Sequence, residues 1–286
     1  KSYKKLKMFK KSVFVIFFLS SCSTINLKIP VNCDFPIHSP YPGGVLNVEI
    51  AMNKVEDISK IKANGQSVTL CASQSDSLKV IAPIPLTEKI NKISLTEGRK
   101  ILASVTLKER KYRESRIKIK NSNLVNPSKE SLPRIRKESL IFKELKQSFQ
   151  AVVNQSMAMD KPLDGINSSE FGVKRFINGS PRNRHTGLDI AAPEGSNVYL
   201  PLDGSVILNA EFFYRGNIIM IDHGNGYISS FSHLQTSLVT EGQKLKKGQL
   251  IGTVGKTGRV TGPHLHWEVS ILGIPVNPEI FLEGNS

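Results

Sequence analysis

The chain has 286 residues, of which 39% are hydrophobic and 22% are charged, and its formal net charge is +15. This length fits about two domains, and the composition argues against both a coiled coil and wholesale disorder. The sequence contains no run of about 20 apolar residues, which is the length that a membrane-spanning helix needs. A strongly basic chain first suggests a nucleic-acid partner, so the position of the charge along the chain matters.

The positive charge is concentrated in two segments. Residues 1–21 carry six lysines and no acidic residue, and residues 99–150 carry fifteen basic residues against five acidic ones. Residues 22–98 are balanced, and residues 151–286 have a net charge of −1. A nucleic-acid-binding domain normally carries the basic charge on the domain itself. The histidine-rich C-terminal region is therefore predicted not to bind nucleic acid.

The first 21 residues have the pattern of an export signal. Lys10 and Lys11 precede an apolar run over residues 13–19, which is too short to span a membrane. We therefore predict a signal peptide over residues 1–21, with Met8 as its natural start.

The residues that end this segment, Leu19-Ser20-Ser21-Cys22, resemble the lipobox of bacterial lipoproteins, in which the chain is cut before a cysteine that becomes acylated. The resemblance implies a lipid on Cys22 that attaches the protein to a membrane. Ser23 in the next position resembles the sorting rule for the outer membrane, so the implied location is the periplasm with the lipid in the outer membrane. An ordinary signal peptide followed by an unrelated cysteine is the alternative.

The chain has three cysteines, Cys22, Cys33 and Cys71. If Cys22 carries a lipid, Cys33 and Cys71 remain as a candidate disulfide in an oxidising periplasm. That bridge would close a loop of about 38 residues and stabilise the fold by about 3–4 kcal/mol in the chain-entropy model. Two separate buried thiols are the alternative.

Residues 22–107 are predicted to form a small all-β domain. Short β-prone stretches alternate with turn residues such as Gly43-Gly44 and Asn64-Gly65, a pattern typical of a sandwich. The predicted strands cover residues 45–50, 67–70, 78–81 and 101–107. Nothing in this region has the pattern of a catalytic site.

Residues 108–158 are predicted to be a basic linker that contains one helix. Apolar residues recur at spacings of three and four from Pro133 to about Val153, which is the period of one helix face. We interpret the surrounding lysines and arginines as a solvated helix face. Attraction to an acidic polymer or to anionic lipid head groups is the alternative.

Residues 159–286 are predicted to form a compact antiparallel β domain, so the whole chain is expected to be mainly β. The dipeptide Asn225-Gly226 between two apolar stretches is a strong hairpin signal. The predicted strands cover residues 197–200, 205–209, 217–221, 227–233, 250–254 and 264–270. No helix is predicted after Ala158.

Five of the six histidines lie between positions 185 and 266. His185 and Asp189 are four residues apart, and His264-Leu265-His266 places two imidazoles on one face of a strand. Three nitrogen or oxygen ligands with an open fourth position are typical of a catalytic zinc site. No cysteine is near these residues in the sequence, which argues against a structural zinc site.

Taken in order, these motifs resemble the lysostaphin/LytM-type zinc endopeptidases, which cut bacterial cell-wall peptides. The similar segment covers about residues 169–278. Its motifs are Phe171-Gly172, His185-Thr186-Gly187-Leu188-Asp189, Asp222-His223-Gly224-Asn225-Gly226, Phe231-Ser232-His233 and Thr261-Gly262-Pro263-His264-Leu265-His266-Trp267-Glu268.

The resemblance implies that His185, Asp189 and His266 bind Zn²⁺ and that His233 and His264 are the two catalytic histidines beside the metal. It also implies an endopeptidase that hydrolyses crosslinks between the stem peptides of peptidoglycan, with the D-Ala–diaminopimelate bond favoured. Which of His233 and His264 takes the proton from water stays open. The alternative function is a degenerate regulator that binds the cell wall or activates an amidase, with a regulatory protein partner that the sequence does not identify.

Three further polar residues near these motifs have structural interpretations. Glu268 shares the strand face of His264 and His266, so it is either an acceptor that orients a histidine or a partly buried strand residue. His223 is expected to have a turn role at the tip of the hairpin. Asp222 is expected to be an Asx-type turn residue.

Overall fold

The computed structural model describes residues 34–73, 76–118, 126–152 and 156–283. The predicted signal peptide, Cys22 and Cys33 lie outside these residues. Cys71 is buried and disulfide-bonded. Within the described part of the chain, no helix has the length and apolar character needed to cross a membrane.

The N-terminal region forms two small antiparallel sheets of three strands each. The first has the order β1-β4-β3, with β1 at Val45–Ala51, β4 at Ser77–Pro83 and β3 at Thr69–Ala72. The second has the order β2-β5-β6, with β2 at Ile61–Ala63, β5 at Lys92–Glu97 and β6 at Lys100–Thr106. Two short 3-10 helices, η1 (Met52–Lys54) and η2 (Ile58–Lys60), connect β1 to β2.

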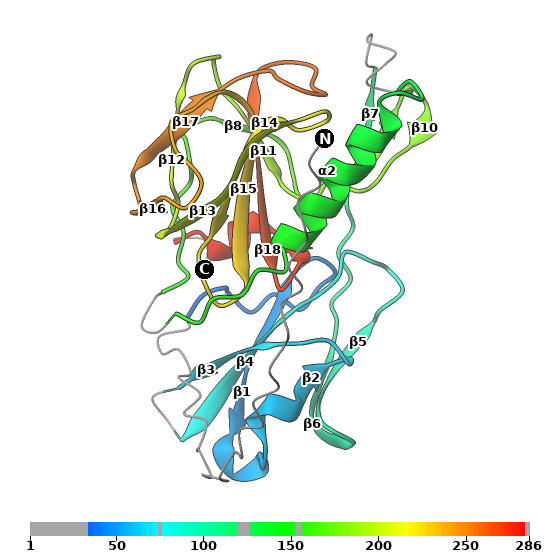
Figure 1. The fold of residues 1–286 in the computed structure, drawn as a ribbon. Helices are drawn as coiled ribbons and strands as arrows, with labels where there is room; N and C mark the ends of the chain where they lie inside the picture. Colours follow the sequence, from blue (N-terminus) through cyan, green and yellow to red (C-terminus); the bar gives the residue numbers. More distant parts are fainter. Residues whose placement is uncertain (1–33, 74–75, 119–125, 153–155, 284–286) are drawn as a thin grey trace, which may run out of the picture.

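The β1-β4-β3 sheet is buried on both faces because alternate residues of its strands enter different cores. Leu78 and Val80 pack with Leu95 of β5, so the two small sheets face each other as a sandwich. Ile81 and Val45 instead join the core of the C-terminal domain. Side chains alternate between the faces of a strand, so the near-continuous apolar run of β4 serves both contacts. Figure 1 shows the N-terminal sheets packed beneath the large C-terminal sheet.

The segment between the two β regions contains a strand as well as the helix α2. Strand β7 (Glu114–Ile117) pairs in parallel with β9 (Lys174–Ile177), and β9 also pairs with β10 (Ser180–Pro181). Part of the predicted basic linker therefore belongs to a sheet with residues of the C-terminal region. Its sequence lacks apolar alternation, so no strand was predicted there.

Helix α2 spans Leu132–Leu145, so the predicted continuation to about Val153 is wrong. After α2 ends, groups of residues 148–152 form hydrogen bonds with the hairpin of β14 (Gly216–Asp222) and β15 (Tyr227–Ser237). The Ser148 hydroxyl donates to Asp222, the Val152 amide donates to the Asn225 side chain, and the Asn225 amide donates to the Gln150 carbonyl. These tertiary hydrogen bonds replace the backbone hydrogen bonds of a further helical turn. Phe149, which is expected on the buried face of the helix, is 55% exposed.

The C-terminal region is built on a ten-stranded antiparallel sheet whose main path is β16-β13-β14-β15-β18-β11-β8. The strands are β8 (Ile166–Ser169), β11 (Leu188–Ala191), β12 (Asn197–Tyr199), β13 (Gly204–Phe212), β14 (Gly216–Asp222), β15 (Tyr227–Ser237), β16 (Lys244–Leu245), β17 (Leu250–Val254), β18 (His264–Ile271) and β19 (Ile274–Val276). A short 3-10 helix, η3 (Pro278–Phe281), follows them. The mainly β prediction is confirmed.

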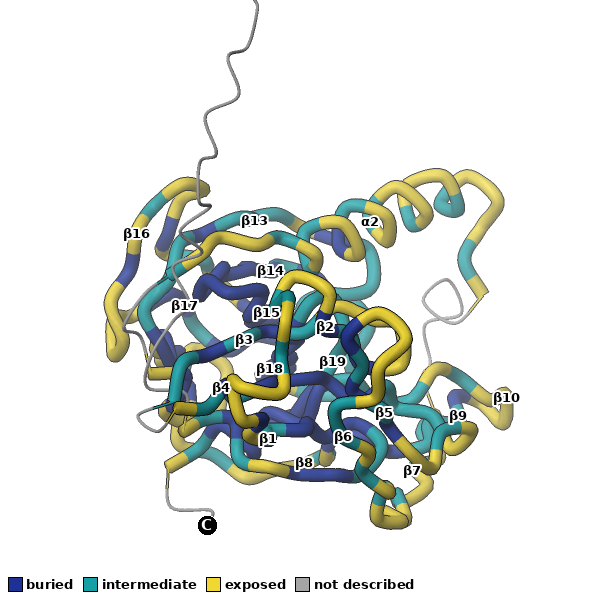
Figure 2. The backbone as a smooth tube through the Cα atoms, turned by 90° about the horizontal axis from the view of Figure 1, so that it is seen from below, coloured by how far each residue is buried: buried dark blue, intermediate teal, exposed yellow. Residues whose placement is uncertain are grey.

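The sheet is covered on one face by the C-terminal core and on the other by α2. In β14, Ile219 and Ile221 enter the C-terminal core, whereas Ile218 and Met220 pack with Phe142 of α2. This two-sided burial explains why β14 reads as a continuous apolar run. Figure 2 shows β14, β15 and β18 in the buried interior and the outer surface of α2 exposed.

The predicted hairpin at Asn225-Gly226 is confirmed by the pairing of β14 with β15. Asn225 has φ of 52° and Gly226 has φ of 80°. Positive φ at both central residues is what a type I′ turn requires, and Asn-Gly adopts it at low cost. The turn joins two long strands that meet next to the histidine cluster.

Candidate metal and catalytic site

Two neighbouring strands, β11 and β18, carry three of the candidate residues. Their antiparallel register places Asp189 opposite His266 and Ala191 opposite His264. Leu265 and Trp267 are fully buried in the packed layer. His264 and His266 alternate with them along β18 and therefore face the other side of the strand. The His-x-His spacing therefore acts as predicted.

His185 precedes β11 and is fixed by its backbone and by its ring. Its amide donates to the Val173 carbonyl and its carbonyl accepts from the Gly172 amide. The ring Nδ1 lies 2.7 Å from the Glu170 carbonyl oxygen, which can only accept, so Nδ1 carries the proton. The lone pair is then on Nε2, which lies 2.9 Å from Asp189 Oδ1 and 3.0 Å from His266 Nδ1.

His266 presents its other ring nitrogen to the same point. Its Nδ1 lies 2.7 Å from Asp189 Oδ1, while its Nε2 lies 3.9 Å from the Glu268 carboxylate. A carboxylate on the Nε2 side favours a proton there and leaves the Nδ1 lone pair for a ligand. His185, Asp189 and His266 are all buried, and their ligand atoms lie within 4.8 Å of one another.

This donor set fits a divalent metal ion. Two imidazole nitrogens and one carboxylate oxygen converge, and each histidine has an acceptor on its far nitrogen, which fixes the tautomer that ligation needs. Zinc accepts this combination of nitrogen and oxygen ligands, and three protein ligands leave one position for water or substrate.

The protonation states of His185 and Asp189 agree with a ligand role. Burial lowers the pKa of His185 to about 4, so this imidazole is neutral at pH 7. Burial alone would raise the pKa of Asp189, but its close contacts with the His185 and His266 rings hold it well below its usual range. Burial alone would lower the pKa of His266, but the neighbouring carboxylates of Asp189 and Glu268 raise it while no metal ion is bound. Asp189 is therefore ionised, as a metal ligand must be.

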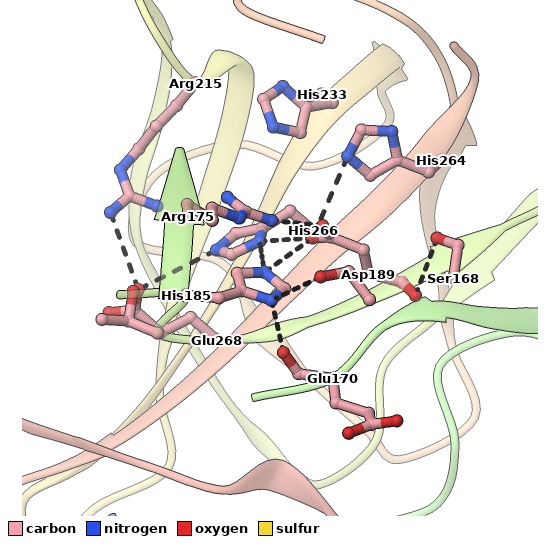
Figure 3. A network of polar contacts seen from close by, with 12 residues as sticks. Ser168, Glu170, Arg175, His185, Asp189, Arg215, His233, His264, His266 and Glu268 are labelled. Atoms are coloured by element: carbon pink, nitrogen blue, oxygen red, sulfur yellow. Dashed lines mark hydrogen bonds and ion pairs between the residues drawn. The ribbon is translucent and has the colours of Figure 1, made fainter. Parts of the chain in front are cut away.

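His233 and His264 lie beside this cluster. Their ring centroids are 4.9 Å apart, and the His233 ring lies 6.1 Å from the His266 ring. Figure 3 shows both rings on one side of the His185–Asp189–His266 cluster, with Glu268 on another side. The structure thus brings all five sequence-predicted residues together.

A break in the β14–β15 register directs the His233 side chain. The pairing shifts between Asn217 and Ile219 of β14, and His233 has φ of 67°. A β-bulge re-aims a side chain, and a left-handed backbone at a non-glycine residue costs about 1–2 kcal/mol. The surrounding sheet holds this conformation, since the His233 amide donates to the Arg215 carbonyl.

Both histidines have Nδ1 fixed as a hydrogen-bond donor. His233 Nδ1 donates to the Thr257 carbonyl at 2.8 Å, and His264 Nδ1 donates to the Gly262 carbonyl at 2.9 Å. In the neutral form of each ring, the lone pair is therefore on Nε2. Burial first, and then the charges that His264 and His266 could carry, hold the pKa of His233 well below its usual range. A neutral imidazole is what a general base requires.

Behind His266 lies a charge network that the sequence did not reveal as a unit. Glu268 is 2% exposed and accepts from Lys146 Nζ at 3.0 Å and from the Thr186 hydroxyl, while Arg215 lies 3.6 Å away. Burial would raise the pKa of Glu268, but the charges of Lys146 and Arg215 and the bond with His266 hold it well below its usual range. Glu268 is thus both buried and an acceptor beside His266.

The metal-ligand carboxylate also has an unpredicted partner. Arg175 of β9 donates to Asp189 Oδ2 at 2.6 Å and leaves Oδ1 directed at the two histidines. No local pattern links Arg175 to Asp189.

The two remaining polar residues have structural positions. The Asp222 side chain accepts from the Gly224 amide at 2.8 Å, which forms the predicted Asx-type turn. His223 is buried, with Nδ1 donating to the Asp203 carbonyl and Nε2 next to the Ser229 hydroxyl, each at 2.8 Å. His223 ties the hairpin to the neighbouring loop.

The segment that carries this site is similar to known proteins. The sequence profile of peptidase family M23 matches residues 183–278. The peptidoglycan DD-endopeptidase ShyA of Vibrio cholerae is 50% identical over 111 residues, which are 38% of this chain and 26% of that protein. The DD-carboxypeptidase/endopeptidase Mpg of Neisseria meningitidis is 42% identical over 111 residues, 39% of this chain and 26% of that protein. The chain therefore spans about a quarter of these curated relatives.

One solved structure resembles nearly the whole chain. A crystal structure of a Pseudomonas aeruginosa protein described as an M23 peptidase superposes with a TM-score of 0.65 at 29% sequence identity. The superposition covers 86% of this chain and 96% of that one. The arrangement of the N-terminal sheets, α2 and the C-terminal sheet therefore has a counterpart in a known structure.

Proposed function

We propose, on the premise that residues 183–278 belong to peptidase family M23, that this chain is a zinc-dependent endopeptidase that hydrolyses peptide crosslinks of bacterial peptidoglycan. The observation that carries the proposal is the convergence of His185, Asp189 and His266, with His233 and His264 beside them. Two relatives that share the segment are named a peptidoglycan DD-endopeptidase, ShyA, and a DD-carboxypeptidase/endopeptidase, Mpg.

The proposed metal ligands are His185 Nε2, Asp189 Oδ1 and His266 Nδ1. Their donor chemistry suits zinc, and no cysteine thiolate is present to close the site. Zinc bound there supplies a Lewis acid for the peptide carbonyl and lowers the pKa of water. The protein's own part is to hold the two imidazoles in the ligating tautomers through Glu170 and Glu268.

The proposed catalytic residues are His233 and His264. Each presents an unprotonated Nε2, so one of them takes a proton from the attacking water as general base. The other, once protonated, donates a hydrogen bond to the carbonyl oxygen as negative charge develops on it. The carbonyls of Thr257 and Gly262 keep both rings in place during these steps.

The finer features of the proposal concern the location of the protein in the cell and the peptide bond that it hydrolyses. We propose that the signal peptide over residues 1–21 exports the chain, that lipid on Cys22 attaches it to the outer membrane facing the periplasm, and that Cys33 pairs with Cys71. In that compartment the favoured substrate is the D-Ala–diaminopimelate crosslink of the stem peptides. The nearly neutral C-terminal region supports a peptide rather than a nucleic acid as the substrate.

Mass analysis of muropeptides tests the proposal. Purified sacculi are digested with the zinc-loaded full chain, with the same protein plus chelator, and with the Asp189→Asn variant. We expect crosslinked dimers to fall to monomers only in the first sample, with cleavage at the D-Ala–diaminopimelate bond. Intact dimers in the presence of stoichiometric zinc would refute the enzymatic function, and stimulation of an added amidase by that inert protein would favour the regulator instead.

A further inference from the structure

Positive charge gathers at the metal site although the region around it is nearly neutral. Residues 151–286 carry a net charge of −1 and contain five arginines. Four of them, Arg175, Arg182, Arg215 and Arg259, sit on segments that border the histidine cluster. All four are half-buried.

The first pair lies on β9 and the strand next to it. Arg175 donates to the ligand Asp189 at 2.6 Å. The Arg182 amide donates to the Arg175 carbonyl at 2.9 Å, so the two residues are neighbours across the β9–β10 turn. This turn therefore carries two guanidinium groups along one side of the site.

The second pair lies next to His233. The His233 amide bonds to the Arg215 carbonyl, and the Arg259 amide bonds to the Tyr214 carbonyl at 2.9 Å. Arg259 also follows Thr257, whose carbonyl holds the His233 ring. The loop that leads to His264 is thus anchored beside both catalytic histidines and carries Arg259 with it.

The charges of the other three arginines act on the Arg259 guanidinium. Its pKa is lowered first by burial and then by the positive charges of Arg182, Arg175 and Arg215, partly opposed by Tyr214. Like charges this close are unfavourable unless an opposite charge joins them. The guanidinium of Arg259 stacks on the Tyr214 ring at 4.2 Å, and it meets no carboxylate among the residues that the structure describes.

The neighbouring carboxylates are already engaged. Asp189 binds Arg175 and points its other oxygen at the histidines, and Glu268 is shared by Lys146, Arg215 and Thr186. A divalent ion on Asp189 would add two more positive charges. The site therefore lacks negative charge, and a substrate is the group that can supply it.

We propose that Arg259 binds a free carboxylate of the peptide substrate next to the bond that is cut. The inference rests on the proposed endopeptidase function and names its substrate class, a peptide with a carboxylate close to the scissile amide. Arg259 suits this task because a planar guanidinium binds a carboxylate through two parallel hydrogen bonds. The Tyr214 ring fixes the plane of the guanidinium, so little side-chain freedom is lost on binding.

A pair of matched ligands tests the inference. One is a crosslinked stem-peptide dimer in which the diaminopimelate carboxyl next to the crosslink is free, and the other is the same dimer with a carboxamide there. Calorimetry measures their dissociation constants on the full chain with chelator present, so that no cleavage takes place. We expect the carboxylate dimer to bind about 10- to 100-fold more tightly than the carboxamide, the range of a hydrogen-bonded charge.

The variant Arg259→Gln should abolish this preference, and Arg259→Lys should retain only part of it because a lysine makes one bond instead of two. Arg136→Gln, which removes an exposed arginine from α2, controls for net charge and should leave the preference unchanged. Circular dichroism and zinc content check that each variant is folded and still loads metal.

Equal affinity of the wild-type protein for both dimers would overturn the inference, as would a preference that persists in folded Arg259→Gln. Cleavage is measured separately on the zinc-loaded protein. A protein that binds the carboxylate dimer through Arg259 but cuts neither dimer would keep this inference and refute the endopeptidase function, so the two failures are distinct.

Discussion

Replacement of Lys146 by methionine tests how far α2 supports the metal site. The Lys146 side chain is 12% exposed and Glu268 is 2% exposed, and their charged atoms lie 3.0 Å apart. Methionine keeps much of the aliphatic stem against Phe142 but removes the ammonium group. Glu268 would then depend on Arg215 at 3.6 Å and on the Thr186 hydroxyl.

The magnitude follows from this arrangement. Removing one partner of a buried ion pair costs about 3–5 kcal/mol when the other charge is left alone. Because Arg215 and Thr186 stay bonded to Glu268, we expect Lys146→Met to lower the free energy of unfolding by about 2–3 kcal/mol. The Glu268 carboxylate that faces His266 Nε2 is held less firmly at the same time, so zinc affinity should fall about 10-fold, the lower end for such outer contacts.

The assay is urea unfolding of the full chain at fixed zinc concentration, together with a zinc titration against a competing chelator. Lys143→Met, an exposed position on the same helix, is the matched control. The double variant Lys146→Met/Glu268→Gln removes both charges of the pair but also takes the carboxylate partner from Arg215, so its loss of stability should be smaller than the sum of the two single losses. If Lys146→Met and Lys143→Met unfold at the same urea concentration and bind zinc equally, the proposed support of His266 by α2 is refuted.

Four other substitutions have defined outcomes. Asp189→Asn should weaken zinc binding by at least about 100-fold in the same chelator titration, since it removes the only anionic ligand. His233→Ala and His264→Ala should each keep one zinc per chain but lose about 100-fold or more in kcat, and near-normal turnover would remove that residue from the mechanism. Burial lowers the pKa of His223, so the unfolded chain binds a proton below about pH 6.5 while the folded chain does not, and stability falls as the pH falls. His223→Gln should flatten this dependence in urea midpoints measured from pH 7.5 to 5, and an unchanged slope would contradict the assignment.

Much of the candidate site could be predicted because its members occur in short patterns. Alternation on a strand puts His264 and His266 on one face, and the register of β18 against β11 then places Asp189 opposite His266. The Asn225-Gly226 turn was readable because positive φ at two successive residues restricts the residue types. The strand alternation and the turn are local constraints, so the sequence alone carries them, whereas the register of β18 against β11 is set by the fold.

The end of α2 could not be predicted in this way. The spacing of Phe149 and Val152 continues the helical period, but the hydrogen bonds of residues 148–152 go to the β14–β15 hairpin about 75 residues later in the chain. Tertiary partners outcompete the next helical turn there, and only the folded neighbours identify them.

The sequence by itself determined the mainly β class and the hairpin, because each depends on near neighbours or on alternation along one strand. It indicated the five residues of the candidate site through the resemblance of their motifs to a known family. Only the tertiary structure decided which charges surround that cluster. Lys146 meets Glu268 across 122 residues, and Arg215, in the turn between β13 and β14, lies 3.6 Å from the same carboxylate. Buried charges find their partners through the packing of distant segments, so the electrostatic character of the site is a property of the fold rather than of any motif.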